Sequence, residues 1–128
     1  MSQHLPVTFT VEIPKAWWMS SNHRPHWAKR KTLTAHLRHL AALEARRQRL
    51  PKDLPPVDVV AYIHPPTRRS EDPNNANPTT KALIDGLTDY GCWPDDSEEY
   101  VTGPDHRLGE PNAGQRLVRF VITPRGPS

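Results

Sequence analysis

The residues best suited to chemistry are oxygen-bearing side chains around one lysine in the second half of the chain. Mg²⁺ takes oxygen ligands, keeps several waters and binds a substrate phosphate as a remaining ligand. A lysine among such ligands can neutralise the charge that builds on the phosphoryl oxygens when a phosphodiester is cleaved. The pattern therefore predicts phosphodiester hydrolysis with a divalent ion. Three segments supply the side chains: Asp72 with Asn74, Lys81 with Asp85, and the adjacent Asp95 and Asp96.

The basic residues are concentrated in a different part of the sequence. Residues 24–49 contain eight Lys and Arg residues against Glu44 alone, a formal charge of +7, whereas residues 68–110 contain ten acids and four basic residues, a charge of −6. A nuclease needs both kinds of surface, cations for the DNA backbone and oxygen ligands for a metal ion. The alternative is two solvated faces that attract each other, in which Lys81 and Asp85 form an ordinary helix-surface pair.

Length and composition limit the class of protein. A chain of 128 residues with 35% hydrophobic residues and a net charge of +3 fits one compact domain, residues 1–128. The single cysteine, Cys92, excludes an intramolecular disulfide. No apolar run is long enough for a membrane helix or a secretory leader. We therefore expect a soluble, cytoplasmic domain with no membrane partner.

Four strands are expected to support the acidic segments. Apolar residues alternate over residues 5–13, 57–64 and 115–124, which is the period of half-buried strands. Residues 99–107 are interpreted as a further strand. The intervening residues 67–78 contain several Asn and Pro residues and must be mostly loop.

Two helices alternate with these strands. Residues 27–50 contain neither Pro nor Gly and carry leucines at positions 33, 37 and 40, a spacing that predicts a long amphipathic helix. Residues 80–90 predict a shorter helix, with Thr79 as its N-terminal cap and Gly91 at its end. The order β-α-β-α-β-β predicts a single α+β domain, close to the α/β class, with a mixed sheet of about four strands and two helices.

Four spaced motifs run through the acidic region. They are, in order, Arg68-Arg69, Asp72-Pro73-Asn74-Asn75, Lys81-Ala82-Leu83-Ile84-Asp85-Gly86-Leu87 and Trp93-Pro94-Asp95-Asp96. Together they resemble the signature of RusA-type Holliday junction resolvases, the small crossover-junction endonucleases common in phages and prophages. Asn22-His23-Arg24, before the basic helix, is a weaker part of the resemblance, which covers about residues 5–123.

The resemblance implies a RusA-like fold and a homodimeric endonuclease that resolves four-way DNA junctions by paired nicks in the cytoplasm of a bacterial host. The ion would be Mg²⁺, with Mn²⁺ as a substitute. By position, Asp72 is the first metal carboxylate, Lys81 the essential lysine, and Asp96, with Asp95 as its alternative, the later metal carboxylate. The acidic cluster adds Asn74 and Asp85 as further metal ligands. The residues expected to bind DNA are Asn22, His23, Arg24, Lys29, Arg30, Lys31, Arg38, Arg68, Arg69 and Asn75.

Two departures from the family pattern leave other functions open. Asn74 stands where the family usually has a second aspartate, and the separation of Asp72 from Lys81 is three residues longer than in the family's compact form. A neutral amide oxygen holds Mg²⁺ with less charge. A second hypothesis is therefore a junction-binding module with weak or no catalysis, and a third is a basic interaction protein whose acids only balance the long helix.

Histidines and tryptophans near the basic helix have further possible roles. Zinc binding is not expected, because zinc sites prefer tighter Cys/His patterns than this one, so we expect the histidines to face phosphates or solvent. A tryptophan can stack on an unpaired base. For at least two of the three tryptophans, however, packing in the core or in a dimer is expected. The residues are His23, His26, His36 and His39, with Trp17, Trp18 and Trp27.

Overall fold

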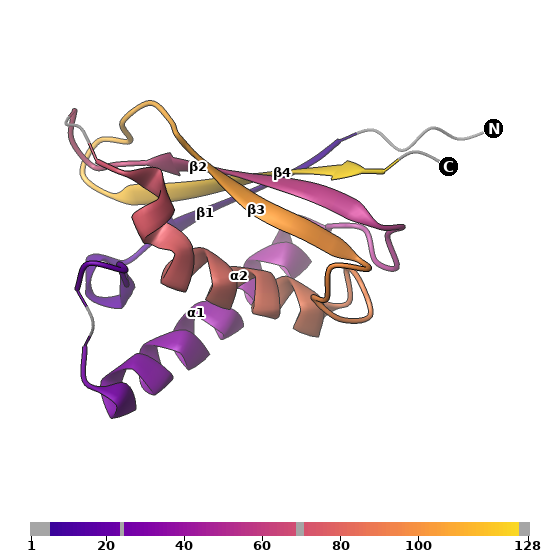
Figure 1. Ribbon diagram of the computed structural model, residues 1–128, viewed down its shortest axis with the longest axis horizontal. Helices are drawn as coiled ribbons and strands as arrows, with labels where there is room; N and C mark the ends of the chain where they lie inside the picture. Colours follow the sequence, from indigo (N-terminus) through magenta and orange to yellow (C-terminus); the bar gives the residue numbers. More distant parts are fainter. Residues whose placement is uncertain (1–5, 24, 69–70, 126–128) are drawn as a thin grey trace.

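A computed structural model of the chain describes residues 6–23, 25–68 and 71–125. These residues form one four-stranded mixed sheet with two α-helices on the same side of it (Figure 1), which confirms the predicted α+β class. The elements, in chain order, are β1 (Val7–Ile13), a 3₁₀ turn (Lys15–Trp17), α1 (Trp27–Arg47), β2 (Val57–His64), a second 3₁₀ turn (Pro73–Ala76), α2 (Asn77–Tyr90), β3 (Val101–Leu108) and β4 (Arg116–Pro124).

The sheet has the strand order β1-β4-β2-β3. β4 pairs antiparallel with both β1 and β2, whereas β2 and β3 are parallel and are connected through α2. Two parallel neighbouring strands require a long crossover connection, because the chain must return to the same end of the sheet. Helix α2, which follows β2 and precedes β3 in the chain, makes this connection. The predicted alternation is confirmed: buried positions are Phe9, Val11 and Ile13 on β1, Val57, Val59, Ala61 and Ile63 on β2, and Val118, Phe120 and Ile122 on β4.

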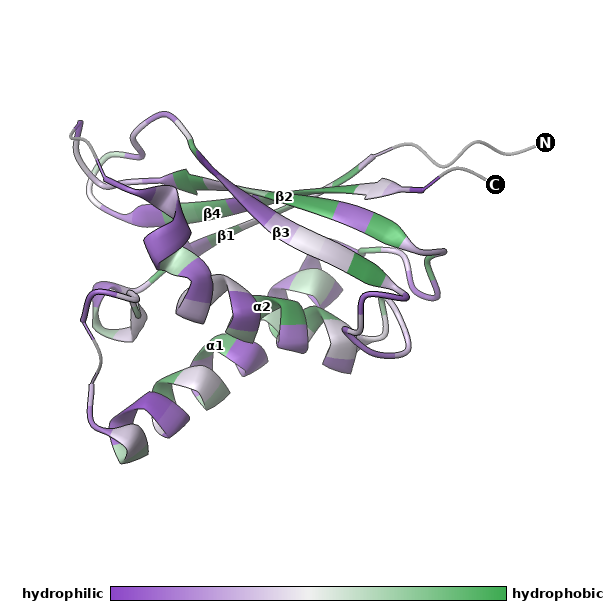
Figure 2. Cartoon of the chain, in the orientation of Figure 1, coloured by the Kyte–Doolittle hydropathy of each residue, from purple (hydrophilic) through white to green (hydrophobic). Residues whose placement is uncertain are grey.

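Strand β3 departs from this pattern. It is apolar at its start, where Val101 is buried, and hydrophilic toward its end (Figure 2). It also lies at one edge of the sheet. Because β3 is parallel to β2, its polar C-terminal half runs toward the loop that follows β2 and precedes α2. The polar side chains of β3 therefore lie near the N-terminal end of α2.

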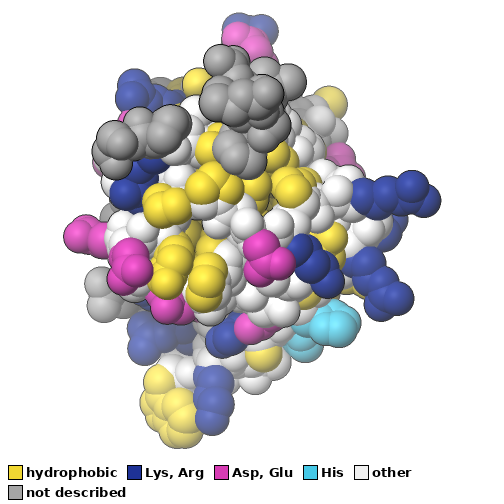
Figure 3. Space-filling view, turned by 90° about the vertical axis from the view of Figure 1, so that its right-hand side faces the viewer, with side chains coloured by type: hydrophobic (Ala, Val, Ile, Leu, Met, Phe, Trp, Pro, Cys, Tyr) yellow, Lys and Arg dark blue, Asp and Glu magenta, His cyan; other side chains and the backbone are white. Residues whose placement is uncertain are grey.

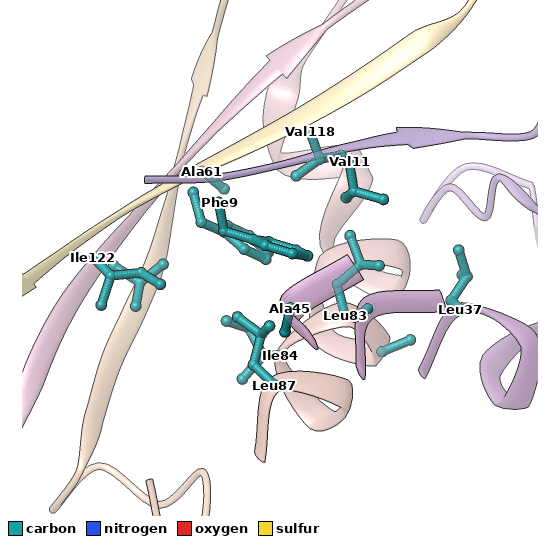
Figure 4. Close-up of a cluster of buried hydrophobic side chains, with 14 of the residues drawn as sticks. Phe9, Val11, Leu37, Ala45, Ala61, Leu83, Ile84, Leu87, Val118 and Ile122 are labelled. Carbon is teal, nitrogen blue, oxygen red and sulfur yellow. The ribbon is translucent and has the colours of Figure 1, made fainter. Parts of the chain in front are cut away.

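The helices close the core against one face of the sheet. Figure 4 shows Ala45 of α1 and Leu83 of α2 beneath Phe9, with Leu37 of α1 farther to the right. The predicted stripe of α1 is correct at its first two leucines, which are buried, but continues through Ala41 and Ala45 rather than Leu40, which is only partly buried. Small residues on this stripe let α1 approach α2 closely.

The predicted cap of α2 is wrong. α2 begins at Asn77, and Ala76 at its N-cap position makes no side-chain cap. The Thr79 hydroxyl instead accepts a hydrogen bond from Met19 N and donates one to Met19 O, both at 2.8 Å, inside the protein. Thr79 therefore fastens the loop before α1 to α2. The predicted end at Gly91 is confirmed by its left-handed φ of 111°.

Candidate active site

The predicted site residues lie in two separate hollows near the start of α2. Lys81 and Asp85 line a groove of about 580 Å³ between α1 and α2. Asp72 and Asn75 line a second hollow of about 350 Å³ in front of the helix. Lys81 and Asp85 therefore line the same groove, whereas Asp72 lines a different hollow.

Two carboxylates meet beside the groove. Asp85, on α2, and Asp96, in the loop that follows this helix, lie within hydrogen-bonding reach of each other. Partial burial and the Asp96 carboxyl raise the pKa of Asp85, whereas the positive charges of Arg38 and Lys81 lower it. A divalent cation would relieve the repulsion between two carboxylates held in this way.

The adjacent residue Asp95 has a different role. Its Oδ1 accepts a hydrogen bond from Ser97 N at 2.8 Å, and hydrogen bonds from Ser97 lower the pKa of Asp95. Asp95 therefore shapes the turn after α2, while Asp96 faces Asp85. The sequence alone does not distinguish between these two neighbours.

Arg38, predicted to bind DNA, is engaged with a carboxylate of the same protein. It donates two hydrogen bonds to Asp89, from Nε at 2.5 Å and from Nη2 at 2.8 Å. This pairing lowers the pKa of Asp89 and raises the pKa of Arg38. A two-point contact fixes the guanidinium plane, so Arg38 joins α1 to α2 and acts on Asp85 through its charge.

Asp72 starts the 3₁₀ turn before α2. Its Oδ1 accepts a hydrogen bond from Asn74 N at 2.9 Å, which orients the carboxylate, and the Asn74 side chain is exposed. The Asn75 carbonyl accepts a hydrogen bond from Ser21 N at 2.8 Å and so holds the loop before α1 against this turn. The residues that line the hollow are Trp18, Ser20, Asn22, Glu71, Asp72, Asn75, Ala76 and Arg116.

A largely buried ion pair borders this hollow. Arg116 Nη1 lies 2.8 Å from Glu71 Oε2, with side chains only 16% and 20% exposed, and the guanidinium lies 4.5 Å from the Trp18 ring centroid. The charge of Glu71 is therefore neutralised. Asp72, which has no ion-pair partner among the described residues, is the acid that this hollow presents.

His106 is a residue of this region that the sequence analysis missed. It lies on β3, where the charge of Asp72 reaches its imidazole. The buried Thr80 hydroxyl donates to Asn77 O at 3.3 Å and so can accept a hydrogen bond from His106 Nε2, 2.7 Å away. Burial lowers the pKa of His106, and Asp105 and Asp72 partly oppose this effect. His106 reaches α2 through the pairing of β3 with β2. The sequence near His106 therefore gives no local signal of this contact.

His106 predicts a pH dependence of stability. Its pKa in the folded state lies below the unfolded value of about 6.5, so the unfolded chain takes up the proton first as the pH falls. Stability from this residue is present above pH 6.5 and is lost as the pH falls through that value toward the folded pKa. We expect His106→Gln to lose less free energy of unfolding between pH 7 and pH 5 than the wild type, measured by urea denaturation. Equal losses would contradict this prediction.

The four acids named as metal ligands, Asp72, Asp85, Asp95 and Asp96, are not gathered at one point. Within residues 6–23, 25–68 and 71–125, no group of three or more His, Cys, Asp or Glu side chains has an arrangement that could hold a metal ion. Asp85 and Asp96 form a pair, and Asp72 lies in the other hollow. Of this set, Asp85 and Asp96 are the two acids that the structure brings together.

The residues predicted to bind DNA are spread over several surfaces. Arg30 and Lys31 line the groove with Lys81, and Asn22 and Asn75 line the hollow of Asp72. Those that line neither are exposed: His23, Lys29 and Arg68. Arg24 and Arg69 lie outside the described residues. Predicted DNA-binding residues thus meet a predicted catalytic residue in both places, Lys81 in the groove and Asp72 in the hollow.

The aromatic residues before and along α1 have distinct environments. Trp17 stacks on His36 with ring centroids 4.8 Å apart, and both Trp17 and Trp18 pack against the core, as expected for two of the three tryptophans. His26 caps α1, its Nδ1 accepting a hydrogen bond from Ala28 N at 3.3 Å. Trp27 is 65% exposed. Cys92 is buried, and its burial raises the pKa of its thiol to about 12.

Charged side chains do not form two cleanly separated faces everywhere. Figure 3 shows the face on the right-hand side of Figure 1, where hydrophobic side chains lie among both acidic and basic ones. This face is therefore neither purely acidic nor purely basic.

A scan against protein-family models finds no match to this chain, and a search of curated proteins finds none either. Among the described helices, none is long and apolar enough to cross a membrane.

Proposed function

We propose that this protein is a metal-dependent endonuclease that cleaves DNA four-way junctions. The observation that best supports the proposal is the meeting of Asp85 and Asp96 beside Lys81 at a groove with further cations. Carboxylates for a metal ion and cations for phosphates are the two requirements of a phosphodiester hydrolase. The choice of a four-way junction as the substrate rests on the sequence resemblance.

The carboxylate pair fits Mg²⁺ by its donor chemistry. Mg²⁺ is commonly held by one or two protein carboxylates and completes its coordination with waters and substrate phosphates. Asp85 and Asp96 supply that number of carboxylates at one place. When bound, the ion would polarise a phosphoryl oxygen and lower the pKa of a bound water.

The chain's own residues would bind and orient the strand. Arg30 and Lys31 line the groove and would hold backbone phosphates. Lys81 lies one helical turn before Asp85 and would neutralise the charge that develops on the cleaved phosphate. Because a four-way junction has approximate two-fold symmetry, a homodimer would present two such sites for two symmetric nicks.

A second candidate function is junction binding without cleavage. The observation that favours it is that Asp72, the first metal carboxylate implied by the resemblance, lines a different hollow from Lys81 and Asp85 and forms no group of three possible metal ligands with the described acids. A module of this kind would bind junctions through the same cations and would be indifferent to Mg²⁺.

The test is a cleavage assay with a labelled synthetic four-way junction and a linear duplex of matched sequence, each in Mg²⁺ and in EDTA. We expect paired nicks on opposing strands of the junction in Mg²⁺ alone, and binding to the junction that weakens steeply as salt rises. Junction-selective binding without nicks would establish the second candidate. Equal binding to both DNAs, without nicks, would remove both candidates.

A further inference from the structure

The groove between α1 and α2 is formed by one face of each helix. The α1 residues follow one another at intervals of three, one, three, one and three, and the α2 residues at intervals of three, one and three, so each set lies on a single helix face. The groove volume of about 580 Å³ lies within the range of roughly 300–1,000 Å³ typical of small-ligand sites. The two sets are Trp27, Arg30, Lys31, Thr34, Ala35 and Arg38, and Pro78, Lys81, Ala82 and Asp85.

Trp27 is the groove residue that the protein's own packing does not explain. Its side chain is 65% exposed, more than any other large hydrophobic side chain in the described part of the chain. Its ring contacts His26 in a tilted arrangement, with centroids 5.6 Å apart, whereas Trp17 stacks on His36 and the Arg116 guanidinium lies over Trp18. An indole this exposed contributes little to the core, and its flat ring borders a groove with an apolar floor that includes Met19.

The groove also carries an excess of positive charge. Arg30 and Lys31 make no ion pair within 4.0 Å with any described carboxylate, and both side chains are exposed. Lys81 adds a third cation, and Asp85 is the one acid that lines the groove. An aromatic ring beside unpaired cations is the combination that proteins use to bind single-stranded nucleic acid, since every base has a face for stacking and every linkage a phosphate.

We propose that this groove binds an unpaired strand of DNA, with one base stacked on Trp27 and the flanking phosphates on Arg30 and Lys31. The inference rests on the proposed function and specifies it: Trp27 would recognise a base that has left the stack at a branch point. A continuous duplex keeps its bases stacked and offers Trp27 no such partner. The groove would thereby favour branched over linear DNA.

The experiment measures the affinity of a short fluorescein-labelled oligothymidylate by anisotropy in EDTA, where no cleavage occurs. Trp27→Ala is expected to weaken binding by about tenfold or more, and Trp27→Phe, which keeps a ring for stacking, by at most about threefold. Leu43→Ala removes an exposed hydrophobic side chain of the same helix outside the groove and is expected to have no effect.

Two comparisons separate stacking from charge. On an oligonucleotide of abasic sugar-phosphates, Trp27→Ala is expected to have no effect, because no base is left to stack. Lys31→Ala is expected to weaken binding to both strands and to reduce the salt slope by about one, whereas Arg46→Ala, the same charge loss at the other end of α1, is expected to leave binding within about twofold.

Three results would overturn the inference. One is equal oligothymidylate affinity for Trp27→Ala and Leu43→Ala. Another is a change in oligomeric state without a change in strand affinity, which would assign Trp27 to contact with a second copy. The third is a preference of tenfold or more for oligouridylate, which would assign the groove to RNA. The proposed function has a separate test. It fails if the wild-type protein does not nick junctions in Mg²⁺, whatever effect Trp27→Ala has on strand affinity.

Discussion

Asp96→Asn is expected to lower the Mg²⁺-dependent cleavage of a four-way junction by about 100-fold or more, the typical size of losing one preorganised charge at a reacting phosphate. Asp96 faces Asp85, so its neutral replacement leaves one carboxylate to hold the ion. Binding of the junction in EDTA is expected to stay the same or tighten, because a negative charge is removed beside the groove. Single-turnover rates and anisotropy give the two quantities.

Asp95→Asn is the matched control. This substitution removes the same charge one residue earlier in the chain. The Asp95 side chain, however, accepts a hydrogen bond from Ser97 N and does not face Asp85, and the amide oxygen of Asn can accept the same hydrogen bond. We expect its cleavage rate to stay within about threefold of the wild type. Equal losses in both variants would mean that the charge of the loop matters and the geometry of the pair does not.

Asp72→Asn separates the two ways of assigning the metal site. The resemblance makes Asp72 a metal carboxylate, whereas in the structure it lines the hollow with Asn75 and not the groove with Lys81. If Asp85 and Asp96 hold the ion, Asp85→Asn abolishes cleavage and Asp72→Asn has a smaller effect. A larger loss of cleavage in Asp72→Asn than in Asp85→Asn would instead assign metal binding to Asp72.

The fold could be predicted because three of its four strands are short and alternate buried with less buried residues. Each buried residue of β1, β2 and β4 lies where the two-residue period places it. The start of α2 was predicted too late because Thr79 was interpreted through local capping preferences, whereas its hydroxyl bonds to Met19, sixty residues earlier in the chain. A contact of this range leaves no local signal at Thr79.

The candidate site could be predicted by residue type but not by arrangement. The sequence indicates that Lys81 and Asp85 share a helix face, since they are four residues apart, and the structure confirms their proximity. Whether Asp95 or Asp96 faces Asp85 depends on the turn after α2, and the engagement of Arg38 with Asp89 depends on how α1 crosses α2. These are tertiary contacts, which the order of residues does not fix locally.

Gly86→Ala is expected to destabilise the protein by about 1–3 kcal/mol, which corresponds to a fall in Tm of roughly 5–15 °C. A Cβ at this position would meet the backbone oxygen of Arg38 and would lie 2.6 Å from the Ala41 Cβ, so α1 and α2 could not keep their present distance. The direction of the change in stability is informative, because Gly→Ala at an exposed position inside a helix stabilises a protein by roughly 0.8–1 kcal/mol. Thermal unfolding followed by circular dichroism measures the effect.

The Ala41→Gly background tests whether the contact between the helices is the cause. Removing the Ala41 Cβ leaves room for part of the added methyl group, so Gly86→Ala is expected to cost less in Ala41→Gly than in the wild type. Gly114→Ala is a control for backbone strain, since its φ is +82° and nothing lies within 4 Å of an added Cβ. An equal cost of Gly86→Ala in both backgrounds would assign the cost to the Arg38 carbonyl and not to the Ala41 Cβ. Because Arg38 belongs to the α1 turn that Gly86 touches, the same packing sets how near its charge lies to Asp85.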